Sequence, residues 1–227
     1  MSYSKLFARV SLNVVIFGVL LFSPAGTLDW WRAWVILAVV LVGTVVTTAS
    51  LLRINKGLLE ERFKPPIQPG QPLADKIVVV HLIAAFVGLF VFIPLDVFRL
   101  HLLPKPGAIV SHVGLGLFVA GWWLMSLALT ENAFAAPVVR HQEERHQRVI
   151  DTGVYSVVRH PMYAGAVPLL VGTPLWLESY AAAVLALVPI GILALRIQVE
   201  ERFLRRELQG YAAYTERVRY KLIPFLW

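Results

Sequence analysis

The chain of 227 residues is 58% hydrophobic and only 15% charged, with a formal net charge of +7. Soluble domains usually contain about 25% charged residues, so this composition leaves too little polar surface for a water-soluble globule and predicts a single all-α membrane domain. The absence of cysteine excludes disulfides, thiolate metal sites and a cysteine nucleophile, and we expect no metal site of any kind.

Apolar runs that approach the length needed to cross a bilayer, about 20 residues, recur along the chain. The first four cover residues 10–24, 30–52, 77–98 and 109–129. The last apolar region, residues 162–195, is too long for one crossing, and Glu178 and Ser179 interrupt it just after Pro174. We therefore expect a hairpin of two short helices and a bundle of five to six transmembrane helices. A re-entrant hairpin that dips into the bilayer and returns is the alternative.

The basic residues indicate how the chain is oriented in the membrane. With a cytoplasmic N-terminus and six crossings, three of the 21 Lys and Arg residues, Arg32, Arg99 and Lys105, fall outside, and the other 18 fall on the cytoplasmic side. This bias follows the positive-inside rule and predicts that both termini are cytoplasmic. The basic residues lie between hydrophobic runs, so we attribute them to anionic lipid headgroups rather than to nucleic acid.

Polar residues gather in the second half of the chain. We divide the domain into N-terminal spans, residues 1–106, and a catalytic half, residues 107–227. The polar segment begins at Glu131 and contains Asn132, Arg140, His141, Gln142, Glu143, Glu144, Arg145, His146, Arg148, Arg159, His160 and Tyr163. Two antiparallel helices of similar length return to the same membrane face. Residues near 160 should therefore lie beside Glu200 and Glu201, around one cytoplasmic mouth.

Such a mouth can hold a ligand that bears both signs of charge. Arg159 and His160 can receive a carboxylate, and the two glutamates can accept hydrogen bonds from an ammonium group or from ribose hydroxyls. The tyrosines can stack on an aromatic base or face a cation.

Residues 151–163, Asp-Thr-Gly-Val-Tyr-Ser-Val-Val-Arg-His-Pro-Met-Tyr, resemble the signature of the isoprenylcysteine carboxyl methyltransferase and phospholipid methyltransferase superfamily. The pattern continues in order with residues 200–204, Gly210, Tyr211, Tyr214 and residues 217–224, and upstream with Asn132, Phe134, Gln142 and His146. The resemblance covers the C-terminal half, from the fourth span onward.

This resemblance implies S-adenosyl-L-methionine as methyl donor and a lipophilic acceptor, a lipid or small molecule, that enters from the bilayer. The residues implied in donor binding are Gln142, His146, Gly153, Tyr155, His160, Tyr163, Glu200 and Glu201, and those implied in catalysis are Arg159, His160 and Glu201. Methyl transfer needs alignment and a water-poor path. For a carboxylate acceptor Arg159 can orient the anion, whereas an amine acceptor needs a base, for which Glu200 and Glu201 are the candidates.

Simpler structural roles compete with these assignments. His160 precedes a proline at a helix start and can act as a cap, Arg159 can be a positive-inside anchor, and the glutamates can pair with arginines one turn further along their helix. The short pair Gly114 and Gly116 fits close helix packing as well as a glycine motif of the phospholipid-methylating branch.

Downstream of the hairpin, three apolar or aromatic residues share one helical face. We expect Tyr211, Tyr214 and Val218 to lie against the membrane surface.

Two other functions remain open at this stage. A sterol or steroid reductase that uses NADPH would carry a similar Arg-His-Pro motif, but the sequence Glu-Glu-Arg-Phe-Leu at residues 200–204 differs from the Arg-Asp-Glu type expected there. A small transporter would concentrate polar groups near the bilayer midplane and often show repeats, whereas this chain gathers them at one mouth. The sequence predicts neither the acceptor nor the oligomeric state.

Overall fold

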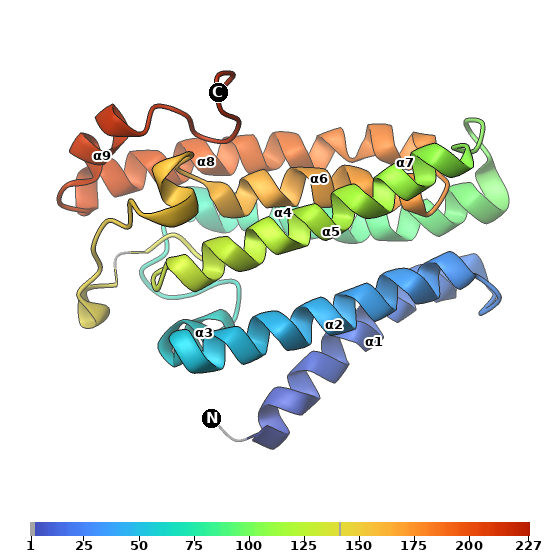
Figure 1. Ribbon diagram of the computed structural model, residues 1–227, viewed down its shortest axis with the longest axis horizontal. Coiled ribbons are helices and arrows are strands. Elements are labelled where there is room, and N and C mark those ends of the chain that lie inside the picture. Colours follow the sequence, from blue (N-terminus) through green and yellow to red (C-terminus); the bar gives the residue numbers. More distant parts are fainter. Residues whose placement is uncertain (1–2, 141) are drawn as a thin grey trace.

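The computed structural model describes residues 3–140 and 142–227, so His141 of the polar segment lies outside the described residues. All regular elements in the described part are helical. The long ones are α1 (Tyr3–Ala25), α2 (Trp31–Ile54), α4 (Leu73–Leu95), α5 (Ala108–Glu131), α6 (Pro161–Trp176) and α8 (Leu187–Glu207). The short ones are α3 (Lys56–Arg62), η1 (Asp96–Leu100), η2 (Glu143–Arg145), η3 (Gly153–Ser156), α7 (Tyr180–Leu185) and α9 (Tyr211–Arg217). Figure 1 shows the long helices running between the same two ends of the molecule.

Within the part of the chain that the structure describes, five helical segments are long and apolar enough to cross a membrane: residues 8–25, 31–54, 73–100, 108–131 and 180–207. At most 33% of any of these spans is buried inside the protein. Such wide apolar surfaces are unfavourable in water and favourable in lipid. The expected all-α integral membrane protein is therefore confirmed.

The hairpin turns where the sequence predicts a break, but its two arms are unequal. Glu178 has a positive φ of 69°, and Ser179 caps α7 by accepting a hydrogen bond from the Ala182 N–H. α6 contains 16 residues, whereas α7 and α8 together extend from Tyr180 to Glu207. The expectation of two short helices is wrong for the second arm, because no glycine or proline stops the helix between Gly191 and Gly210.

The hairpin turn lies at the far end of the bundle from the polar segment. Arg32, at the start of α2, donates to the Trp176 carbonyl over 3.1 Å, and the Trp176 indole donates back to the Arg32 carbonyl over 2.9 Å. Ser179 donates to Asp96, at the end of α4, over 2.6 Å. Both arms thus run the length of the bundle, and the shorter arm, α6, covers about 24 Å of it at 1.5 Å per residue.

Glycines bring α5 and α6 into backbone contact. A Cβ atom at Gly114 would lie 2.7 Å from the Trp176 nitrogen, and one at Gly165 would lie 2.9 Å from the Met125 nitrogen. Only glycine permits this approach. Gly116 has no atom within 4 Å of such a Cβ, so close packing explains Gly114 alone. The contact fixes the start of α6 beside the loop that follows α5.

The short helix α9 packs inward, and its expected contact with the membrane surface is wrong. Tyr211, Tyr214 and Val218 are buried together with Leu208. The Tyr214 hydroxyl donates to the Tyr155 carbonyl over 2.7 Å. The aromatic face of α9 therefore closes the polar end of the bundle instead of contacting lipid.

Candidate active site

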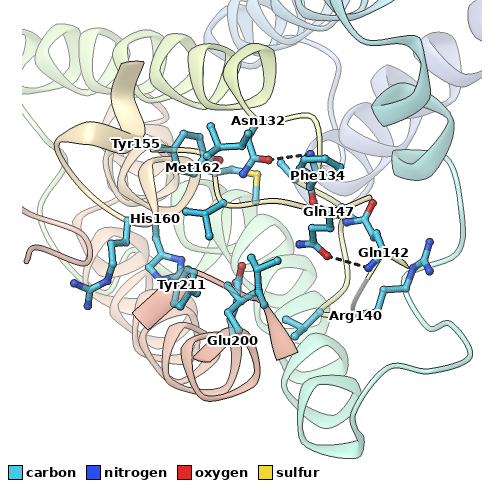
Figure 2. A pocket seen from close by; sticks show the side chains of 18 of the residues that line it. Asn132, Phe134, Arg140, Gln142, Gln147, Tyr155, His160, Met162, Glu200 and Tyr211 are labelled. Carbon is cyan, nitrogen blue, oxygen red and sulfur yellow. Dashed lines mark hydrogen bonds between the residues drawn. The ribbon is translucent and has the colours of Figure 1, made fainter. Parts of the chain in front are cut away.

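A polar cavity lies at the end of the bundle where α5 ends and α6 begins, which we call the site end. The loop between these helices forms one wall, and α8 with α9 forms the other. Its lining includes Asn132, Phe134, Arg140, Gln142, Gln147, Tyr155, His160, Met162, Glu200 and Tyr211, which Figure 2 labels. Amides, both signs of charge and aromatic rings therefore face one space.

The two stretches expected to meet are in direct contact. The Arg159 Nε donates to Glu201 Oε1 over 2.6 Å, and the His160 Nε2 lies 3.2 Å from the same oxygen. The Tyr163 hydroxyl donates to Glu200 Oε2 over 2.7 Å. The predicted adjacency of the chain near residue 160 with the chain near residue 200 is confirmed.

The Arg159–Glu201 pair holds protein segments together. Arg159 is 6% exposed and Glu201 5% exposed. Arg159 also donates to the carbonyl oxygens of Val218 and Arg219, over 2.6 and 2.9 Å. Glu201 does not line the cavity. Its carboxylate pairs with Arg159 rather than with an arginine further along α8, and its expected role in ligand binding stays a prediction.

Next to that pair, His160 and Tyr163 present their rings to the cavity. The two rings are stacked, with centroids 5.6 Å apart and an angle of 12° between their planes. Both residues line the cavity, as does Glu200, whose carboxylate accepts the Tyr163 hydroxyl hydrogen. His160, Tyr163 and Glu200 thus lie around one cavity, as the sequence predicts.

Of the upstream residues expected to bind the donor, Gln142 and Tyr155 line the cavity. Gln142 is 1% exposed, and its side-chain amide donates to the Phe134 carbonyl over 2.9 Å. Tyr155 is also buried, and burial raises the pKa of its phenol far above the usual value. It therefore faces the cavity as a neutral hydroxyl.

His146 and Gly153, also expected to bind the donor, do not line the cavity. His146 is exposed and ends the turn η2 with a positive φ of 51°. Gly153 has φ 54° and lies against the Glu131 carboxyl group, which a Cβ atom would approach to 2.8 Å. Both residues shape the backbone of the loop, a role that sequence spacing does not separate from ligand contact.

Sequence reasoning missed two site residues that lie on the spanning helices α4 and α8. Arg196 of α8 lines the cavity, although the sequence suggests only a positive-inside residue. Asp75 of α4 lies 3.4 Å from Arg196 and is 0% exposed. A signal was present, since an aspartate at the edge of an apolar span is costly and therefore a functional candidate.

A second, apolar cavity of about 290 Å³ lies deeper in the bundle, between α1, α2, α4, α5, α6 and α8. Its walls include Phe17, Val40, Phe86, Phe90, Phe118 and Trp122. Its charged lining residues are Arg62 and Arg196. Met162, Tyr163 and Arg196 line both cavities, so the polar and apolar spaces meet at these three residues, which we call the junction.

Residues 110–210 match the family model described as phospholipid methyltransferase. The chain is 30% identical over 112 residues to protein-S-isoprenylcysteine O-methyltransferase B of Arabidopsis thaliana, covering 48% of this chain and 57% of the relative. It is 33% identical over 121 residues to a probable protein-S-isoprenylcysteine O-methyltransferase of Oryza sativa subsp. indica, covering 52% of this chain and 62% of the relative. The chain thus spans less than two thirds of the length of these relatives.

Among solved structures, a eukaryotic intramembrane Ras methyltransferase, isoprenylcysteine carboxyl methyltransferase, aligns with this chain at a TM-score of 0.47 and 19% identity, covering 100% of this chain and 88% of that one. The family match covers α5 and α6 with the loop between them, and continues through α7 and α8 to Gly210. It therefore includes His160, Tyr163 and Glu200, which line the polar cavity. The C-terminal half of the chain is therefore similar to the phospholipid methyltransferase family and to plant isoprenylcysteine O-methyltransferases.

Proposed function

We propose that this protein transfers a methyl group from S-adenosylmethionine to a lipophilic acceptor held within the membrane. The observation that carries the proposal is the junction. A cavity with mixed charge and a cavity with apolar walls share Met162, Tyr163 and Arg196. A polar donor and an apolar acceptor can therefore approach each other without leaving their preferred surroundings.

The lining of the polar cavity fits the chemistry of this donor, which carries an amino acid group, ribose hydroxyls and an adenine ring and supplies an activated methyl group. Glu200 can accept hydrogen bonds from an ammonium group or from hydroxyls, and Arg148 can receive a carboxylate. The aromatic rings of Tyr155, Tyr211 and Tyr214 offer stacking surfaces. We assign these residues to donor binding.

The free volume of the polar cavity is about 90 Å³, below the roughly 300 Å³ of typical ligand sites. We therefore expect the loop between α5 and α6 to move outward when the donor binds. Within the loop, the Gln147 side chain accepts from the Gln142 N–H over 2.9 Å, as Figure 2 shows. The part around Gln142 and Gln147 can therefore move together, while Val139 and Arg140 stay joined to Asp75 and Glu61.

The apolar cavity is suited to the hydrocarbon part of the acceptor, and its charges favour an anionic end. Arg62 donates to the Ala135 carbonyl over 2.9 Å, and no ion pair joins it to a carboxylate among the described residues. Burial lowers the pKa of its guanidinium, and neighbouring Arg196 contributes to the same effect. A half-buried cation without a counter-charge is unfavourable, so an anion beside Arg62 is stabilised.

A carboxylate acceptor needs no base, because it is already ionised and the reaction neutralises it. Arg62 and Arg196 would orient it, and the apolar walls would exclude water from its path. An amine acceptor would have to lose a proton, for which Glu200 is the nearest carboxylate lining the polar cavity. The two arginines lead us to favour the carboxylate.

We also propose that the site end faces the cytoplasm, together with both termini. The support is the distribution of Lys and Arg along the sequence. Thiol labelling of single cysteines placed at each end tests this directly, since the natural chain contains none.

The function is tested with the full chain in lipid nanodiscs. Radiolabelled S-adenosylmethionine is supplied with N-acetyl-S-farnesylcysteine, with phosphatidylethanolamine or with total lipid extract, and titration calorimetry compares S-adenosylhomocysteine with NADPH. We expect labelled farnesylcysteine ester and selective binding of S-adenosylhomocysteine, both lost in Glu200→Gln. Tight binding of NADPH alone, with no labelled product from any acceptor, overturns the proposal.

A further inference from the structure

Asp75 is a fully buried carboxylate near the start of α4, in the half of the chain that the family match does not reach. Burying a carboxylate is unfavourable unless other groups compensate it. Asp75 Oδ2 accepts hydrogen bonds from the Gln71 side chain over 2.6 Å and from the Val139 N–H over 3.0 Å. Asp75 Oδ1 lies 3.4 Å from Arg196 Nε, an ion pair in which neither of these two buried atoms makes a hydrogen bond. One carboxylate thus binds the wall of the polar cavity and a cation at the junction.

Arg196 is held on three sides. Besides Asp75, its Nη2 donates to the Pro137 carbonyl over 2.5 Å, and its guanidinium lies 5.8 Å from the centre of the Tyr163 ring. It is 7% exposed, and Asp75 is its ion-pair partner among the described residues. Asp75 therefore supplies the negative charge that faces this guanidinium, while the Pro137 carbonyl and the Tyr163 ring contact its other sides.

We infer that Asp75 is a positioning residue, which fixes the Arg196 guanidinium at the junction where donor and acceptor meet. This inference rests on the proposed methyl transfer and extends the site to the N-terminal half of the chain. Its physical basis is the sensitivity of such reactions to alignment, since a displacement of about 1 Å can lower a rate roughly 100-fold. A guanidinium released from Asp75 can adopt other rotamers and leave the acceptor misaligned.

A merely structural role predicts something different. Asp75 also holds Val139, so its loss could disturb the wall of the donor cavity whatever residue stands at position 196. That role predicts weaker donor binding and a loss of turnover that is independent of Arg196. The positioning role predicts unchanged donor binding and a loss of turnover that requires Arg196.

The experiment is a double-mutant cycle of the wild type, Asp75→Asn, Arg196→Gln and the double variant in nanodiscs. We measure kcat with N-acetyl-S-farnesylcysteine at saturating donor, and the Kd of Asp75→Asn for S-adenosylhomocysteine. Each single substitution should lower kcat about tenfold or more, with the double variant within about twofold of Arg196→Gln. The Kd of Asp75→Asn should stay within about threefold of the wild type.

Two further variants keep the test decisive. If Arg196→Gln does not fold, Arg196→Lys replaces it, because lysine keeps the charge without the planar fork. Glu178→Gln is the matched control: it breaks the half-buried 3.0 Å pair with Arg32, which also stacks on Trp176, at the opposite end of the bundle. It should lower thermal stability and leave kcat per folded molecule unchanged.

The positioning role is overturned if the kcat losses of the two single variants multiply in the double variant, or if Asp75→Asn keeps the wild-type kcat. In both cases the proposed function stands. A wild-type protein that methylates no acceptor removes the proposed function and this inference with it.

Discussion

Arg159 and Glu201 form a buried ion pair with 2.6 Å between Nε and Oε1, although 42 positions separate them in the chain. The pair joins the loop before α6 to α8, and Arg159 adds two hydrogen bonds to the carbonyls of Val218 and Arg219. The backbone follows the same path, since the Arg159 and His160 N–H groups donate to the carbonyls of Tyr220 and Lys221. The C-terminal segment is therefore fastened to the site through these groups.

This geometry predicts opposite effects for the two neighbouring glutamates. Glu201→Gln leaves Arg159 buried without its counter-charge, which should cost about 3–5 kcal/mol of stability. Glu200→Gln keeps an oxygen for the Tyr163 hydroxyl, so its stability loss should be about 1 kcal/mol or less, while its affinity for S-adenosylhomocysteine falls at least tenfold. Thermal unfolding and calorimetry measure the two quantities. Wild-type stability in Glu201→Gln combined with lost donor binding would return Glu201 to the ligand site.

The glycine contacts between α5 and α6 give a prediction with an internal control. Gly121→Ala forces a Cβ atom to 2.9 Å from the Leu169 nitrogen, whereas Gly116→Ala meets nothing within 4 Å. We expect Gly121→Ala to destabilise the protein by at least about 2 kcal/mol, because overpacking shifts backbone, and Gly116→Ala to be neutral or slightly stabilising. Thermal unfolding of both variants in one detergent decides the matter. Equal melting temperatures would contradict the close packing.

The spans and the meeting of the two stretches follow from the sequence, because apolar length and antiparallel geometry depend on local rules. The place of Asp75 in the site does not follow from the sequence. Its approach to Arg196 depends on how α4 and α8 are offset along their axes, which only packing determines. His146 and Gly153 do not line the polar cavity, and the sequence could not show this, since a residue with a positive φ and a residue that contacts a ligand look alike in a motif. The inward packing of α9 depends on the hydrogen bond from Tyr214 to Tyr155, a contact between distant segments.

Acidic pH should weaken the anchor of the loop on α3. Glu61 pairs with Lys64 and with Arg140, which lines the polar cavity. Burial opposes ionisation of Glu61, but the hydrogen bonds from both cations outweigh it and hold its pKa below 4.5. A carboxylate with a lowered folded-state pKa stabilises the protein above its unfolded pKa and loses this contribution as the pH falls.

Thermal unfolding of wild type and Glu61→Gln between pH 7 and pH 3 tests this anchor. The wild type should be the more stable protein above about pH 4.5, and the difference should shrink as the pH falls below that value. A constant difference over the whole range would show that Glu61 acts through packing alone. Glu144→Gln serves for comparison, because Glu144 pairs with the same Arg140 but its side chain is 54% exposed, so its effect should be small.

Arg62 gives the sharpest test of the acceptor's charge. It lines the apolar cavity from α3, outside the family match, and no ion pair joins it to a described carboxylate. If an acceptor carboxylate neutralises it, Arg62→Gln should raise the KM for N-acetyl-S-farnesylcysteine about tenfold, since a charge-assisted contact contributes roughly 1.5–3 kcal/mol. Arg62→Lys should recover part of that loss, and the affinity for S-adenosylhomocysteine should not change. Arg53→Gln, an exposed arginine of α2 outside both cavities, controls for the loss of one positive charge. The opposite result would be faster turnover of phosphatidylethanolamine by Arg62→Gln with an unchanged KM for N-acetyl-S-farnesylcysteine. In that case the acceptor is an amine, because removing the cation favours a neutral amine over a carboxylate anion.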